Sequence, residues 1–174
     1  MLGDAKLNTE LLVNRCCERR ALSLDSDLKP KSTVRVVIVE DFVAFRRLIC
    51  SILGKREDLQ IICEVSDGLE GVQKAEELKP DLILLDIGLP KLNGLQAARE
   101  IRKLAPESKI IFVSQESSPD LVQEALSSGA QGYVAKASLE RDLLVAVEAV
   151  LEGKQFISSS LISGDPAKQL PRGF

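Results

Sequence analysis

From residue 34 onward, short apolar runs alternate five times with longer stretches that carry a single apolar stripe. The runs are typical of β-strands and the stripes of amphipathic helices. Several runs are apolar at consecutive positions, which indicates parallel strands covered by helices on both faces. We expect the first, third and fourth strands at the centre of the sheet, the five runs being VRVVIVE (34–40), QIICEVS (60–66), DLILLD (81–86), KIIFVS (109–114) and QGYVAK (131–136).

This alternation predicts an α/β protein with a doubly wound five-stranded parallel sheet, in the order 2-1-3-4-5. We expect an extension and linker over 1–33, one domain over 34–156 and a tail over 157–174. The first helix carries an apolar stripe that includes Phe45 and Ile49, which predicts that Arg46 and Arg47 face water.

The amino-acid composition limits the partners and the catalytic sites that this chain can have. The chain has 174 residues, 45% of them hydrophobic and 28% charged, as expected for one folded domain with short extensions. A net charge of -3 gives no positive field toward nucleic acid or anionic lipid. The chain has no histidine, so a Ser-His-Asp triad, a Cys-His pair and an HExxH zinc site are all excluded.

The cysteines and the apolar stretches indicate an intracellular protein. No apolar stretch approaches the ~20 residues that cross a bilayer, and no signal peptide is evident, so we expect a cytoplasmic protein without a membrane partner. The cysteines lack metal-ligand spacing and are expected to be buried, reduced thiols: Cys16, Cys17, Cys50 and Cys63.

Polar residues follow the predicted strands at the edge where a doubly wound sheet binds its ligands. The first strand ends in Glu40 and Asp41, and the third ends in Asp86. The fourth ends in Ser114 and the fifth in Lys136. Since neighbouring strands are about 4.8 Å apart, we expect three carboxylates, a hydroxyl and an ammonium to share one rim.

A cluster of three carboxylates and one ammonium keeps an excess of negative charge, which a divalent cation would neutralise. Only oxygen ligands are available, so the sequence predicts Mg²⁺, held by Asp41, Asp86 and the carbonyl of Gly88. An aspartate between a metal and a lysine is suited to attack phosphorus, which makes Asp86 the expected nucleophile. Lys136 and Ser114 would then bind the product.

With these motifs, the chain from about Val34 to Phe156 resembles the receiver domain of two-component response regulators, which has a CheY-like, flavodoxin-like fold. The resemblance rests on Glu40-Asp41, on Asp86 in DLILLDIGLPKLNG, on Ser114 in KIIFVS and on Lys136 in GAQGYVAKA. It implies Mg²⁺-dependent phosphorylation of Asp86 by a histidine kinase or phosphotransfer protein, with Glu40 completing the metal ligands. It also implies that Tyr133 is an aromatic switch paired with Ser114.

The resemblance extends to one branch of the family. Ala137 follows Lys136 where proline is frequent, as in receivers that usually precede a LuxR-type helix-turn-helix domain. Only 18 residues follow Phe156, too few for that domain, so we expect a stand-alone receiver with no nucleic acid bound by this chain. A receiver cut from a longer DNA-binding regulator is the alternative, and a homodimer is left open.

The sequence disfavours two other functions of this fold. A nucleotide-binding protein is disfavoured because the first strand-helix turn reads VEDFVAF where a Gly-rich phosphate loop is needed. A phosphohydrolase is disfavoured because Gly88 cannot be a general acid. We therefore expect no enzyme beyond catalysis of the chain's own phosphorylation and dephosphorylation. Two simpler readings stay open: docking without phosphorylation, and helix-capping roles for Asp86 and Ser114.

Overall fold

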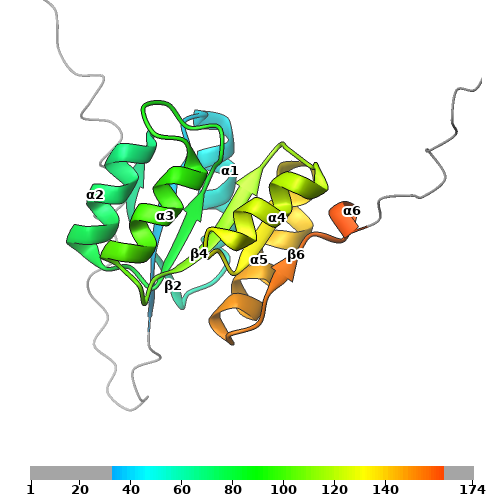
Figure 1. The fold of residues 1–174 in the computed structure, drawn as a ribbon. Coiled ribbons are helices and arrows are strands. Elements are labelled where there is room, and N and C mark those ends of the chain that lie inside the picture. Colours follow the sequence, from blue (N-terminus) through cyan, green and yellow to red (C-terminus); the bar gives the residue numbers. More distant parts are fainter. Residues whose placement is uncertain (1–32, 163–174) are drawn as a thin grey trace, which may run out of the picture. The chain divides into compact units, whose positions relative to one another are not determined.

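The structure is a computed structural model that describes residues 33–162 (Figure 1). Its strands form one parallel six-stranded sheet in the order β2-β1-β3-β4-β5-β6. The predicted α/β parallel fold and the order of the first five strands are confirmed, and a sixth strand is added. The strands are β1 (Val34–Val39), β2 (Leu59–Val65), β3 (Leu82–Leu85), β4 (Lys109–Ser114), β5 (Gly132–Ala135) and β6 (Phe156–Ile157).

Helices cover both faces of the sheet, with α1 and α5 on one face and α2, α3 and α4 on the other (Figure 1). Consecutive strand residues point to opposite faces, so each apolar strand supplies both cores. In β1, for example, Val37 packs beneath α2 and α3 while Val36 packs beneath α1 and α5. The helices are α1 (Val43–Leu53), α2 (Gly68–Leu78), α3 (Gly94–Leu104), α4 (Pro119–Ser127), α5 (Leu139–Leu151) and α6 (Ser159–Ile162), with a 3-10 turn, η3 (Lys136–Ser138).

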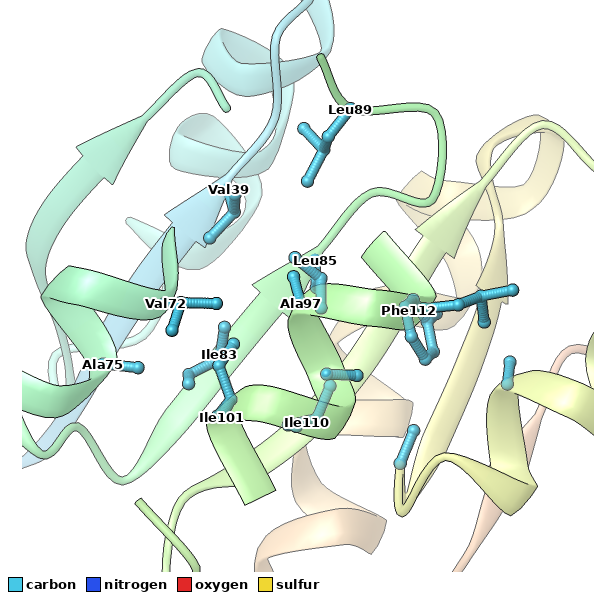
Figure 2. Packing of buried hydrophobic residues seen from close by; sticks show 14 of the residues in the cluster. Val39, Val72, Ala75, Ile83, Leu85, Leu89, Ala97, Ile101, Ile110 and Phe112 are labelled. Atoms are coloured by element: carbon cyan, nitrogen blue, oxygen red, sulfur yellow. The ribbon is translucent and has the colours of Figure 1, made fainter. Parts of the chain in front are cut away.

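The core beneath α2 and α3 fixes the strands that carry the polar rim. Figure 2 shows Ile83 of β3 between Val72 of α2 and Ile101 of α3, with Phe112 of β4 to the right. Ile83, Ile101 and Phe112 have no exposed surface. Burying a side chain of this kind stabilises the fold by about 1.5–3 kcal/mol. This packed core therefore holds the ends of β1, β3 and β4 in place.

The start of α3 is pressed against the end of β3. Asn93 caps the helix by accepting a hydrogen bond from the Gln96 amide at 2.9 Å. A Cβ on Gly94 would lie 2.0 Å from the carbonyl oxygen of Asp86. Only glycine allows this close approach, which fixes the backbone of Asp86 against α3.

One sequence prediction for α1 is wrong. Arg47 is exposed as predicted, but the side chain of Arg46 is only 15% exposed. Arg46 lies three and seven positions before Ile49 and Leu53, which are buried, so the helix period places all three on one face. Arg46 therefore turns inward, and its guanidinium reaches the end of β1.

The sixth strand lies where the sequence predicted the domain to end and a tail to begin. The Phe156 amide donates to the Gln131 carbonyl at 3.0 Å, and the Ser158 amide donates to the Tyr133 carbonyl at 2.9 Å. Ser158 has no exposed surface. Residues 156–162 are thus attached to β5.

The cysteines differ from the prediction. Cys50 and Cys63 are half-buried, not fully buried as predicted. No helix within residues 33–162 is both long and apolar enough to span a membrane. The expected N-terminal extension with Cys16 and Cys17 lies outside the described residues, as does 163–174.

Candidate functional site

The structure brings together the three acidic residues that the sequence placed at strand ends. β1 and β3 are neighbours, and the pairing of Val39 with Leu85 sets the following residues, Glu40 and Asp86, side by side. One carboxylate oxygen from each of Glu40, Asp41 and Asp86 lies within 4.8 Å of the others. Glu40 and Asp86 are buried and Asp41 is exposed, so the cluster opens to solvent on the Asp41 side.

Lys136 reaches this cluster from the end of β5. Its Nζ lies 2.9 Å from Asp86 Oδ2 and 3.0 Å from Glu40 Oε1, and its side chain is 4% exposed. The ammonium also lies 4.6 Å from the centroid of the Phe45 ring, a cation-π contact. One ammonium against three carboxylates leaves the excess of negative charge that the sequence predicted.

One carboxylate oxygen of Glu40 is buried without a full set of hydrogen-bond partners. Its Oε2 is buried and lies 2.7 Å from Lys136 Nζ, yet it makes no hydrogen bond of ordinary geometry. Burial raises the pKa of the Glu40 carboxyl above its usual value, although the hydrogen bond from Lys136 opposes this. A buried carboxylate oxygen without a full complement of partners favours a bound cation.

The oxygens present fit a magnesium ion. Glu40, Asp41 and Asp86 offer hard carboxylate ligands, and the exposed side leaves room for the waters that Mg²⁺ retains. Gly88 lies in the exposed loop after Asp86, and a Cβ on it would lie 3.9 Å from Asp86 Oδ2. The backbone of Gly88 therefore lies beside the carboxylate of Asp86, and its carbonyl stays a predicted ligand.

The carboxylate of Asp86 is held in a fixed orientation. Its Oδ1 accepts a hydrogen bond from the Ile87 amide at 2.7 Å, while Oδ2 accepts from Lys136. The Asp86 amide donates to the Val39 carbonyl at 2.9 Å. Because α3 is capped by Asn93, Asp86 is not the N-cap of that helix, and the simplest structural explanation for this aspartate does not apply.

Ser114 and Tyr133 lie at the same end of the sheet. Ser114 is buried, and its Oγ accepts a hydrogen bond from the Glu116 amide at 3.1 Å. Helix α4 is capped by Ser118, so Ser114 is not its cap. Tyr133 is buried, and its hydroxyl donates to the Glu116 carbonyl at 2.9 Å. Burial raises the pKa of Tyr133, and the nearby Ser114 hydroxyl opposes this.

A clamp that the sequence analysis missed holds the loop containing Gly88. Lys91 Nζ donates to Asp67 Oδ2 at 2.7 Å, and the hydrogen bond from Lys91 lowers the pKa of Asp67. The Gly68 amide donates to the Pro90 carbonyl at 3.3 Å. No sequence pattern predicts this contact, because Asp67 and Lys91 are 24 residues apart on different loops.

Comparison with known proteins identifies the family. The family model described as the response regulator receiver domain matches residues 36–148. The chain belongs to the response regulator receiver family. The resemblance drawn from the acidic pair, the phosphoacceptor motif and the lysine is thereby confirmed at the level of the family and its fold.

Relatives of the receiver come from longer regulators. The oxygen regulatory protein NreC of Staphylococcus epidermidis is 32% identical over 74% of this chain and 59% of its own length. A LuxR-family two-component response regulator from Aurantimonas is 28% identical, with a TM-score of 0.72 over 75% of this chain and 94% of that one. The receiver domain of the putative response regulator NarL from Mycobacterium tuberculosis is 28% identical, with a TM-score of 0.67 over 71% and 99%. The chain thus spans about three fifths of the length of NreC.

Proposed function

We propose that Asp86 accepts a phosphoryl group from a histidine kinase or phosphotransfer protein in a Mg²⁺-dependent reaction, and that the resulting change of conformation is the signal. One observation carries this proposal: carboxylate oxygens of Glu40, Asp41 and Asp86 converge within 4.8 Å, and Lys136 binds two of these residues. Membership of the receiver family supports it. Because a histidine kinase draws its phosphoryl group from ATP, we expect the reaction to take place in the cytoplasm.

The chemistry follows from the orientation of Asp86. A lone pair on its carboxylate forms the new P–O bond while the donor's P–N bond breaks, and the electron pair of that bond goes to the donor imidazole, which takes a proton from solvent. Mg²⁺, when held by Glu40, Asp41, Asp86 and the Gly88 carbonyl, supplies charge neutralisation for the transferred oxygens. Lys136, 2.9 Å from Oδ2, is placed to bind the same oxygens.

The response follows from the contacts of Ser114. A phosphoryl group adds negative charge and acceptor oxygens beside Asp86, which attract the Ser114 hydroxyl. That hydroxyl now accepts from the Glu116 amide, and Tyr133 donates to the Glu116 carbonyl. A move of Ser114 toward the phosphoryl group therefore releases one bond to Glu116 and disturbs the other. In this proposal Tyr133 and the loop after Ser114 form the switch.

The test is phosphorylation by acetyl phosphate. With Mg²⁺, intact-mass spectrometry should show one added phosphoryl group on the wild-type protein and none on Asp86→Asn. Asp120→Asn, which changes an exposed carboxylate in the first turn of α4, is the matched control and should be labelled like the wild type. Chelation of Mg²⁺ should abolish labelling. Absence of label on the wild-type protein would leave docking without phosphorylation as the function.

Two routes for the output are compatible with this reaction. In the first, the receiver signals alone, through contacts with another protein. In the second, it regulates a DNA-binding segment, which is favoured by the similarity to the LuxR-family regulator of Aurantimonas and by the greater length of NreC. The mass of the protein isolated from its host, detected with an antibody to the receiver, distinguishes the two. Neither route adds an enzyme activity beyond phosphorylation and dephosphorylation of Asp86.

A further inference from the structure

Arg46 contacts the acidic cluster through the backbone of Glu40. Its Nη1 donates to the carbonyl oxygen of Glu40 at 2.6 Å. Its Nε lies 3.5 Å from Oε2 of Glu64, which comes from β2 and holds the guanidinium in place. With a side chain 15% exposed, Arg46 contrasts with its neighbour Arg47, which is exposed.

The backbone of Arg46 also forms a hydrogen bond with Phe42, the residue after Asp41. The Arg46 amide donates to the carbonyl of Phe42 at 3.1 Å, as part of the first turn of α1. Arg46 therefore binds the carbonyl groups of both residues that flank Asp41, one through its side chain and one through its backbone. The peptide unit that precedes Asp41 and the one that follows Phe42 are thereby tied to helix α1.

This restraint matters because Asp41 itself is exposed and α1 has no side-chain cap. An exposed acidic side chain gains little orientation from packing, so its position depends on the backbone that carries it. We infer that Arg46 is a positioning residue that sets the Glu40-Asp41 backbone for Mg²⁺ binding. The inference rests on the proposed function, since it assumes that the acidic cluster binds the ion.

Charge and positioning predict opposite effects for the loss of Arg46. A guanidinium near the cluster repels a cation, so its charge alone opposes Mg²⁺ binding, and removing it would tighten the complex. If Arg46 acts by positioning, its removal frees the Glu40 carbonyl and weakens the complex. Groups that orient metal ligands typically change metal affinity by about 10- to 100-fold when mutated. The direction of the change therefore separates the two roles.

The experiment compares Arg46→Gln with Arg47→Gln, which lose the same charge from adjacent positions of the same helix. Mg²⁺ is titrated into each full chain by calorimetry, and thermal unfolding is followed in parallel. We expect the Kd for Mg²⁺ to rise about tenfold in Arg46→Gln, and to stay unchanged or fall slightly in Arg47→Gln. Equal Kd values in the two folded variants would overturn the inference.

Two further measurements keep the test decisive. If Arg46→Gln does not fold, Arg46→Lys replaces it; it keeps the charge but loses the forked donor, so weaker Mg²⁺ binding supports positioning and unchanged binding overturns it. The rate of labelling by acetyl phosphate is then measured against Mg²⁺ concentration, and saturating Mg²⁺ should restore most of the lost rate. A wild-type protein that binds Mg²⁺ without being labelled would refute the proposed function but not the role of Arg46.

Discussion

The ammonium of Lys136 lies 2.9 Å from Oδ2 of Asp86, in a site where both side chains are almost fully buried. Lys136 thus occupies the place of a counter-ion to Asp86 and, through a second contact, to Glu40. Without it, two buried carboxylates face each other with no positive partner. This relationship makes the stability of the receiver depend on what balances their charge.

Replacing Lys136 with alanine should therefore lower the free energy of unfolding without Mg²⁺ by about 3 kcal/mol, as expected when one partner of a buried ion pair is lost. Mg²⁺ should restore part of this loss, because it supplies the missing positive charge. Urea unfolding with and without Mg²⁺ measures both effects. Equal losses in the two conditions would show that the lysine acts by packing.

We also expect Lys136→Ala to accept phosphate but to change conformation less.

Tyr133 provides a built-in probe of the proposed switch. It is the only tyrosine, and the chain has no tryptophan, so tyrosine absorbance and fluorescence report this residue alone. Burial raises its pKa above the ordinary tyrosine value of about 10, so the folded protein should form tyrosinate only at higher pH than the protein in urea. A titration monitored by ultraviolet absorbance measures the difference.

The same shift predicts how stability varies with pH. Above the unfolded pKa of about 10, the unfolded chain loses the Tyr133 proton while the folded chain retains it. The free energy of unfolding should therefore fall as the pH rises through this range, and Tyr133→Phe should remove that fall. Identical titrations of the folded and unfolded protein would contradict the burial of this hydroxyl.

Two glycines near Asp86 should respond to alanine in opposite ways. A Cβ on Gly88 meets only Asp86 Oδ2, at 3.9 Å, whereas a Cβ on Gly94 would lie 2.0 Å from the Asp86 carbonyl oxygen. Gly88→Ala should therefore raise the free energy of unfolding by about 0.4–1 kcal/mol, by reducing the freedom of the unfolded chain. Gly94→Ala should lower it by about 3 kcal/mol through overpacking. Urea unfolding of both variants tests this contrast, and equal effects would contradict the close packing of α3 on Asp86.

Asp142 should make the receiver sensitive to acid. Arg141 Nε donates to its Oδ1 at 2.7 Å, and the Ser138 hydroxyl donates to its Oδ2 at 2.8 Å. These contacts, that of Arg141 above all, lower the pKa of Asp142 from 3.8 to about 2. The stabilisation is complete above the unfolded pKa and is lost as the pH falls toward 2.

Between pH 4 and pH 2, Asp142→Asn should accordingly lose less free energy of unfolding than the wild type. This range lies between the ordinary pKa of an aspartate and the lowered pKa of about 2. Arg141→Gln should give part of the same change. Urea unfolding at several pH values measures the slopes. A slope that is the same in all three proteins would contradict the role assigned to these contacts.

The sequence predicted those features that depend on local pattern. The run KIIFVS predicted the bounds of β4 without error, because four apolar residues lie between the polar Lys109 and Ser114. The convergence of Glu40, Asp41, Asp86 and Lys136 followed from parallel strands, whose ends must meet at one edge. The predicted position of Ser114 at the end of β4 followed from the same rule.

Features that depend on tertiary contact were missed. β6 has only two residues, too few to show a period, and it forms because β5 presents a free edge. Arg46 could have been placed by its spacing from Ile49 and Leu53, but charge suggested solvent. The contact that turns it inward, with the Glu40 carbonyl, belongs to a strand end that sequence patterns do not describe.

The pairing of β6 with β5 bears on where the receiver can be trimmed. The family match ends at Glu148, but Ser158 Oγ accepts a hydrogen bond from the Ala135 amide at 3.1 Å, directly before Lys136. A protein shortened to the matched residues would leave that amide and the Tyr133 carbonyl without these partners. It would also bare a strand edge of the kind that recruits other chains into aggregates. A shortened receiver should therefore keep β6 and Ser158.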